Sequence, residues 1–218
     1  MPKQFDLLVF DWDGTLSDST HAIVVSVQEA ARDAGLPIPG EADARSIIGL
    51  ELHRAITVLL PDADAAQLEL LAERYRVQFH TRSHGIALFD GVAEAVKQLA
   101  DEGFLLAVAT GKTRRGLERA LDESGLRPYF QTSRCADECF SKPHPQMLLQ
   151  IMDELNVAPE RTLMIGDTSF DLQMANSASA RSLAVTYGAQ PLENLLAHKP
   201  LDHFDNFAQV WQWLQTNA

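Results

Sequence analysis

The sequence predicts an α/β protein in which helices cover both faces of a parallel sheet. From residue 88 onward, short apolar runs of strand length alternate with segments of helical periodicity, which is the pattern of parallel strands joined by helical crossovers. Between residues 20 and 82, by contrast, we find only helical patterns. We therefore expect a three-layer, Rossmann-like sheet core with an α-helical cap domain inserted after the first strand.

The expected elements follow from apolar spacing and from the glycines and prolines between them. The first strand opens the stretch L-L-V-F-D-W-D-G-T-L-S-D-S at residues 7–19. The insertion predicts helices at about 21–34, 42–48, 52–60 and 65–80. The remainder predicts strands at 105–109, 131–133, 162–165 and 181–185, and helices at about 92–102, 115–124, 145–155, 170–177 and 207–214. The resulting domains are residues 1–17 and 84–218 for the core and 18–83 for the cap.

Composition restricts the partners of the chain. Its 218 residues carry a formal net charge of -12, which argues against a nucleic-acid or anionic-membrane surface. The N-terminal apolar run is too short for a signal peptide or a membrane span, so we expect a cytoplasmic protein. Cys135 and Cys139 are weak evidence for zinc, and we expect two reduced thiols. The oligomeric state, monomer or homodimer, is left open.

Chemically active residues follow several of the expected strands. Asp11 and Asp13 come directly after the first strand and Thr110 after the second, while Asp167 follows the strand that ends at residue 165. Ligands of such sheets bind outside the carboxyl ends of the strands. We therefore expect these residues to converge on one edge of the sheet, together with Asp171 and with Lys142 from a loop that opens a helix.

This set of residues suits phosphoryl transfer. Clustered carboxylates without histidine or cysteine suit a hard cation, and Mg²⁺ is the usual choice when a phosphate completes the coordination. An ionised aspartate can attack phosphorus to form an aspartyl-phosphate that water later hydrolyses. A second acid two residues further on can protonate the leaving oxygen and then take a proton from water. The lysine and the hydroxyl would stabilise charge on the transferring group.

Four motifs in order extend this interpretation to a family: D-W-D-G-T-L-S-D-S, A-V-A-T-G-K, S-K-P-H-P and M-I-G-D-T-S-F-D-L. Over essentially its whole length the chain resembles the haloacid dehalogenase superfamily, in the phosphoglycolate-phosphatase-like branch with a helical cap. The resemblance implies a Mg²⁺-dependent phosphatase that hydrolyses a small phosphorylated metabolite, a phosphoglycolate-like phosphomonoester.

The resemblance also implies roles for individual residues. Asp11 would be the nucleophile and a metal ligand, and Asp13 the general acid/base whose backbone carbonyl also binds the metal. Thr110 and Lys142 would bind the phosphoryl group. Asp167 would be a metal ligand, and Asp171 would support the metal or the lysine.

Cap closure would exclude water and supply specificity contacts. We place Gly111 of the core in the substrate-binding set. Arg45, Gly49 and His53 lie where family caps approach the active site, and we add Arg45 and Gly49 to that set.

Single positions separate the chemistries of relatives. Asp13 counts against carbon–halogen cleavage, because dehalogenases lack the second aspartate. It also counts against a phosphonatase-like hydrolase, which often carries alanine there although it shares Trp12. A sugar-phosphate mutase of the β-phosphoglucomutase type keeps both acids and remains an alternative. Thr110-Gly111-Lys112 fits the hydrolases better than the serine pairs of mutases, although many of those hydrolases have asparagine where this chain has Gly111.

Two non-enzymatic functions are alternatives to the phosphatase. A receiver-type phospho-acceptor would not need a helical insertion after the first strand, and a silent interaction protein would not need the intact acids, threonine and lysine. Elsewhere, we expect Trp12 to pack away from the site, and we expect His80 and His84 to form solvated surface rather than a metal site. Arg114 and Arg115 could meet an anionic substrate, although exposed surface is the commoner role of such residues.

Overall fold

The sheet of the computed structural model, which describes residues 3–218, has six parallel strands in the order β3-β2-β1-β4-β5-β6. The central strand β1 pairs with β2 on one side and β4 on the other, with Phe10 opposite Val108 and Ile165. Residue 11 therefore leaves the sheet between the ends of two neighbours. The strands are β1 (Leu7–Phe10), β2 (Leu105–Thr110), β3 (Thr132–Cys135), β4 (Thr162–Gly166), β5 (Arg181–Val185) and β6 (His203–Phe204).

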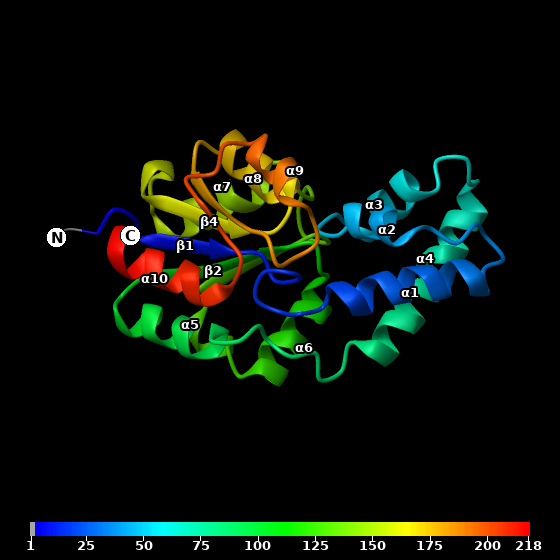
Figure 1. The fold of residues 1–218 in the computed structure, drawn as a ribbon, viewed down its shortest axis with the longest axis horizontal. Helices are drawn as coiled ribbons and strands as arrows, with labels where there is room; N and C mark the ends of the chain where they lie inside the picture. Colours follow the sequence, from blue (N-terminus) through cyan, green and yellow to red (C-terminus); the bar gives the residue numbers. More distant parts are fainter. Residues whose placement is uncertain (1–2) are drawn as a thin grey trace.

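Helices cover both faces of the sheet, which confirms the predicted fold class (Figure 1). Alternate side chains of β1 explain this, since Leu8 and Phe10 pack into one apolar cluster and Leu7 and Val9 into another. The first cluster includes residues of α5 (Val92–Asp101), α6 (Arg114–Ser124) and α10 (Phe207–Asn217). The second includes residues of α7 (Gln146–Leu155) and α8 (Ser169–Ser177).

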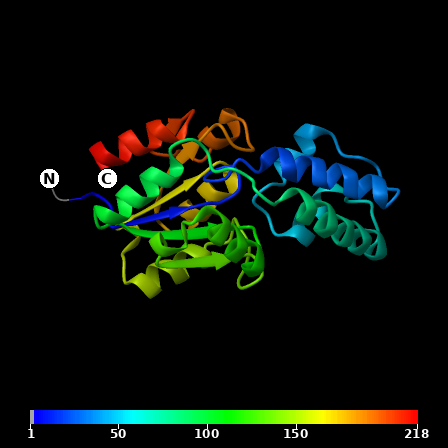
Figure 2. The same ribbon diagram turned by 90° about the horizontal axis from the view of Figure 1, so that it is seen from below.

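The inserted segment forms four helices beyond the carboxyl ends of the strands (Figures 1 and 2). It has its own apolar clusters, in which Ala30 and Ala31 of one helix meet Leu71 and Ala72 of another. A capping box at Asp64 starts the longest helix. The helices are α1 (Thr20–Asp33), α2 (Glu41–Ser46), α3 (Leu52–Leu59) and α4 (Ala65–Arg82).

The observed α-helices and strands match the expected ones within a few residues, with two omissions. The short helix α9 (Leu192–Leu196) and the two-residue strand β6 were not predicted, because neither is long enough to show a periodicity. The domain boundaries at residues 17 and 84 stay a prediction, as do the cytoplasmic location and the monomeric or homodimeric state. Within residues 3–218, no helix combines the length and apolar character needed to cross a membrane.

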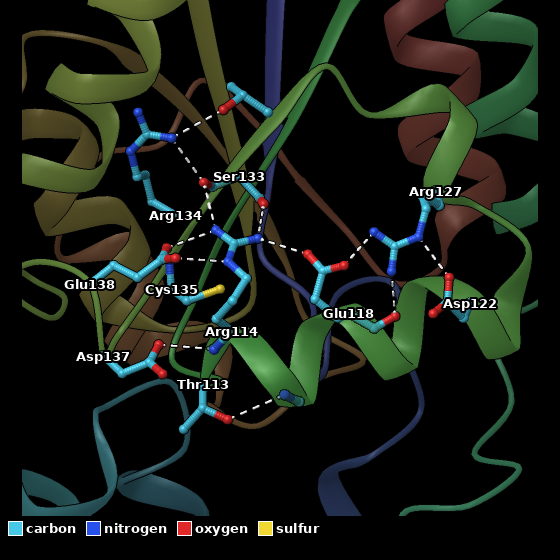
Figure 3. Close-up of polar contacts among 12 residues, drawn as sticks. Thr113, Arg114, Glu118, Asp122, Arg127, Ser133, Arg134, Cys135, Asp137 and Glu138 are labelled. Carbon is cyan, nitrogen blue, oxygen red and sulfur yellow. Dashed lines mark hydrogen bonds and ion pairs between the residues drawn. The ribbon is translucent and has the colours of Figure 1, made fainter.

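A network of charged side chains attaches α6 to the edge strand β3 (Figure 3). The Arg114 guanidinium donates to both carboxylate oxygens of Glu138, at 2.8 and 2.7 Å, and to the Ser133 hydroxyl at 2.6 Å. The amide of Ala136 donates to the Lys112 carbonyl at 3.0 Å. The loop after β2 is thereby fixed beside β3, and Arg114 is committed to structure rather than to a ligand.

Candidate active site

Three buried carboxylates meet at the carboxyl edge of the sheet. One oxygen each from Asp11, Asp167 and Asp171 lies within 4.8 Å of the others. Asp11 follows β1, Asp167 follows β4, and Asp171 lies in the first turn of α8. Gly14 has a φ of +78°, and a Cβ there would lie 2.2 Å from an Asp167 carboxylate oxygen, so this turn needs glycine.

Lys142 is the cation of this cluster, and its side chain is completely buried. Its ammonium lies 2.8 Å from Asp11 Oδ1 and 2.7 Å from Asp171 Oδ1. Burial alone would lower the pKa of Lys142, but the two carboxylates outweigh it and raise the pKa above its ordinary value. One permanent positive charge therefore faces three carboxylates.

The pKa values of two of the acids, Asp167 and Asp11, are also raised. Burial raises the pKa of Asp167 to about 7, the Asp171 charge adds to this, and hydrogen bonds from the Ala189 amide (2.7 Å) and the Thr15 hydroxyl (3.0 Å) oppose it. Burial likewise raises the pKa of Asp11 well above its usual range, against the pull of Lys142. The cluster is short of positive charge.

The donor set fits a hard divalent cation. Asp11 Oδ2 is buried and has no hydrogen-bond partner among the described residues, whereas Oδ1 accepts from the Trp12 amide at 2.6 Å. A buried oxygen without a partner is costly unless a ligand completes it, and three carboxylates are the oxygen ligands that Mg²⁺ prefers. Both oxygens of Asp171 are engaged by neighbouring side chains: Oδ2 accepts from the amide and hydroxyl of Thr168 at 3.1 and 2.7 Å, and Oδ1 forms an ion pair with Lys142 at 2.7 Å. Asp171 therefore fits a supporting position.

Asp13 is placed apart from this cluster. Its Oδ1 accepts a hydrogen bond from the Ser19 hydroxyl at 2.6 Å and forms an ion pair with Lys112 at 2.8 Å. The pairing with Lys112 was not anticipated, although Lys112 ends the motif that carries Thr110. Thr110 itself is buried at the end of β2, and its hydroxyl accepts from the Lys112 amide at 3.2 Å.

Gly111 lies where the cap touches the core. A Cβ at this position would be 2.7 Å from the Gly49 carbonyl oxygen and 3.0 Å from that of Leu50. Gly49, with a φ of +96°, in turn lies close to Thr168. Glycine at position 111 thus lets the cap backbone approach the loop that follows β2.

Arg45 makes a second contact between cap and core. Its guanidinium donates to the carbonyl oxygens of Gly188 at 2.5 Å and Ala189 at 3.1 Å. Ala189 is the residue whose amide holds Asp167. Arg45 therefore attaches the cap to the loop that contacts Asp167. The predicted substrate-binding roles of Arg45, Gly49 and Gly111 stay predictions.

A cavity of about 740 Å³ lies between the cap and the core. Asp11, Asp13 and Gly111 line it from the core. The cap side is largely apolar and includes Ile23, Val27, Ile48, Tyr75 and Phe79. A ligand in this cavity would reach both acids of the first motif.

The residues that sequence reasoning set aside behave mostly as expected. Trp12 is 2% exposed and packs in the core. His80 and His84 are exposed; the His80 ring lies 2.9 Å from the Arg119 guanidinium, and the His84 ring lies 3.3 Å from the Glu123 carboxylate. Both cysteines are free, and burial raises the pKa of Cys135 to about 12.

Comparisons with known proteins agree with this geometry. A family model described as "Haloacid dehalogenase-like hydrolase" matches residues 8–185. The chain is 35% identical to "Probable phosphatase IndB" of Dickeya dadantii, over 94% of this chain and 91% of that protein. It is 30% identical to a "Phosphoglycolate phosphatase" of Vibrio vulnificus, over 95% of each chain.

A crystal structure of a predicted phosphoglycolate phosphatase from Haemophilus somnus shares the fold. Its TM-score is 0.88 at 24% identity, and the match covers 97% of this chain and 99% of that one. The chain therefore belongs to the haloacid dehalogenase-like hydrolases. The predicted family and the predicted class of hydrolase are confirmed.

Proposed function

We propose that this protein is a Mg²⁺-dependent phosphatase that hydrolyses a small phosphomonoester through an aspartyl-phosphate on Asp11. The observation that carries the proposal is the state of the Asp11 carboxylate. Its Oδ1 is held by Lys142 and the Trp12 amide, while Oδ2 has no hydrogen-bond partner within residues 3–218 and belongs to a side chain that lines the cavity. One oxygen is thus oriented and the other is available as a nucleophile.

The metal would be held by Asp11, Asp167 and the Asp13 backbone carbonyl, with Asp171 in support. When bound, Mg²⁺ would neutralise the acidic cluster and the charge of the phosphoryl group, so that an anionic ester could approach.

The reaction consists of two displacements at phosphorus. Asp11 Oδ2 forms a bond to phosphorus while the ester P–O bond breaks, and Asp13 gives its proton to the departing alcohol oxygen. Asp13 then takes a proton from water, whose oxygen attacks phosphorus and breaks the bond to Asp11. Inorganic phosphate leaves and both aspartates return to their first state.

The remaining polar groups stabilise the transferring phosphoryl group. The Thr110 hydroxyl and the Lys142 ammonium would donate to its oxygens, where negative charge is concentrated. Ser19 and Lys112 hold the Asp13 carboxylate in position. Related proteins named phosphatase and phosphoglycolate phosphatase support the reaction class, and a phosphoglycolate-like ester is the substrate that the family resemblance suggests.

Phosphate release from a generic aryl phosphate, with Mg²⁺ and with a chelator, tests the proposal. We expect release only with the metal, and Asp11→Asn, which keeps the size of the side chain, should reduce the rate at least about 10³-fold. Metal-independent release, or normal turnover by Asp11→Asn, would contradict it. A sugar phosphate whose phosphate reappears at a new position would instead favour the mutase alternative.

A further inference from the structure

We propose that the alcohol portion of the substrate carries a flat apolar ring, which packs against Tyr75 and Phe79 of the cap. This inference rests on the proposed phosphatase function and narrows its substrate class. It keeps the phosphatase reaction but departs from the phosphoglycolate-like ester that the family resemblance suggests.

The two aromatic rings are connected to the proton donor through Lys112. Tyr75 and Phe79 lie one turn apart on α4 and stack on each other, with ring centroids 5.6 Å apart and an interplanar angle of 7°. The Lys112 ammonium lies 5.1 Å from the centroid of Phe79 and 2.8 Å from Asp13 Oδ1. Asp13 would protonate the leaving oxygen, so the aromatic pair lies on the side of the site where the leaving group departs.

The size and polarity of the cavity agree with a ring. Its volume of about 740 Å³ falls within the range of pockets that bind drug-sized ligands. Apolar side chains of α1 and the α2–α3 turn, including Ile23, Val27 and Ile48, continue the lining from the aromatic pair. Ile23, Val27 and Ile48 are themselves buried, so the apolar area left for a ligand is the part of the lining that faces the cavity. A two-carbon acid would contact little of it, whereas a ring would cover more of it at a gain proportional to the apolar area.

The cations around the cavity are already engaged. Lys142 and Lys112 each pair with carboxylates of the site. Arg76 pairs with Glu69, and Arg119 donates to Ser83. A carboxylate attached close to the ester would therefore have to compete with protein acids for a positive partner.

Arg115 is the exception among the arginines that line the cavity. Within residues 3–218 it forms no ion pair, but its side chain is exposed to solvent. Apart from Arg115, the described lining thus offers apolar surface rather than an unpaired arginine or lysine.

Tyr75 adds one polar feature to this surface. Its hydroxyl makes no hydrogen bond to any other residue that the structure describes, although the side chain is largely buried and lines the cavity. Burial, reinforced by the charge of Asp13, raises the pKa of Tyr75 above its ordinary value, so the phenol stays protonated. It can donate one hydrogen bond to a substituent on the bound ring.

Two alkyl esters that differ only in the ring test the inference. With Mg²⁺ present, kcat/KM should be at least about tenfold higher for 2-phenylethyl phosphate than for ethyl phosphate, and higher than for 2-phosphoglycolate. Both alcohols are primary, so the comparison reports binding of the ring rather than leaving-group chemistry. Equal values for the two alkyl esters, or a preference for 2-phosphoglycolate, would overturn the inference.

Variants of α4 locate the effect. Phe79→Ala should bring the ratio of kcat/KM between the two alkyl esters close to one, and Phe79→Leu, which keeps an apolar side chain without the flat ring, should give an intermediate ratio. Glu73→Ala changes an exposed residue of α4 outside the cavity lining and should keep the wild-type ratio. If Phe79→Ala loses its helical circular-dichroism signal, Phe79→Leu alone decides, and an unchanged ratio in it refutes the contact.

The failure of this inference can be told from failure of the proposed function. If the aryl phosphate shows metal-dependent phosphate release but kcat/KM is equal for the two alkyl esters, the phosphatase function is supported. Only the proposal of a ring in the substrate is then contradicted. If no ester shows metal-dependent phosphate release, both the phosphatase function and the ring-bearing substrate are contradicted.

Discussion

Two clusters of charged side chains in this molecule are built in opposite ways. The network around Arg114 on the core surface is partly exposed, and its guanidinium is shared among Glu138, Glu118 and Ser133 (Figure 3). The cluster at the carboxyl edge of the sheet is buried, and a single lysine there faces three carboxylates.

The contrast separates structural from chemical use of charge. Exposed pairs are screened by water and contribute little individually, but they fix geometry where several share one group. Buried charges are costly to desolvate and are tolerated when they are compensated or have a ligand to hold. Asp11 Oδ2 has no hydrogen-bond partner among the described residues, and the cluster has a deficit of positive charge. Both features support the proposal that the buried cluster is the active site.

The largest change should follow from removing the buried cation of the carboxylate cluster, Lys142. Lys142→Met would leave Asp11 and Asp171 without their shared partner, and we expect the metal-free protein to lose about 3 kcal/mol of unfolding free energy. The rate of phosphate release should fall at least about 10²-fold, since a donor to the phosphoryl group is lost. Denaturant titration and a phosphate assay measure the two effects. A variant of unchanged stability would show that Lys142 does not neutralise the cluster.

The acids should make the metal-free protein sensitive to pH. The pKa of Asp167 is raised to about 7 in the folded state, so its contribution to stability is fully present below about pH 4 and is lost as the pH rises through 7. Without metal, the free energy of unfolding should decrease between pH 5 and 7, by up to about 1.4 kcal/mol per pH unit for this group. Asp11, whose pKa is also raised, acts in the same direction.

Denaturant titrations at several pH values, in chelator and in Mg²⁺, measure this slope. Asp167→Asn should reduce it in the metal-free protein. Saturating Mg²⁺ should stabilise the wild type more at pH 7 than at pH 5, because protons compete with the metal for the same oxygens. If Asp167→Asn has the wild-type slope, the titrating group lies elsewhere.

A smaller effect is expected at the edge of the site. Lys112→Met removes the partner of Asp13, and we expect kcat to fall about tenfold with a changed pH profile, since Asp13 would be less well positioned for proton transfer. Lys112→Arg should restore part of the rate. The free energy of unfolding should fall less than in Lys142→Met, because the Lys112 side chain is 11% exposed whereas that of Lys142 is completely buried. A change confined to KM would mean that Lys112 serves binding rather than Asp13.

The smallest effect belongs to the surface network. Arg114→Ala should lower the free energy of unfolding by about 1 kcal/mol, because hydrogen bonds to Glu138 and Ser133 are lost at a partly exposed site. Activity should stay within about twofold of wild type. Arg127→Ala, on the more exposed side of the same network, should have a smaller effect on stability. A loss of activity clearly greater than twofold would show that the network also controls the loop after β2, which is proposed to bind the phosphoryl group.

The helical cap shows how far sequence reasoning reaches. Its four helices were predicted because amphipathic periodicity is local information, carried by residues three and four apart. Its contacts with the core were not predictable in this way. Arg45 meets Gly188 and Ala189, and Gly111 meets Gly49, across long separations along the chain.

By itself, the sequence determined the parallel sheet, its helical insertion and the edge at which the acids collect. Apolar runs predict buried strands. In a parallel sheet the carboxyl ends of the strands lie at the same edge, independently of the conformation of the loops. Only the tertiary structure decided that Lys142 lies between Asp11 and Asp171, that Lys112 pairs with Asp13, and that the cap leaves an aromatic-lined cavity above them. Such pairings join residues that are far apart in the sequence, and local sequence patterns carry no information about them.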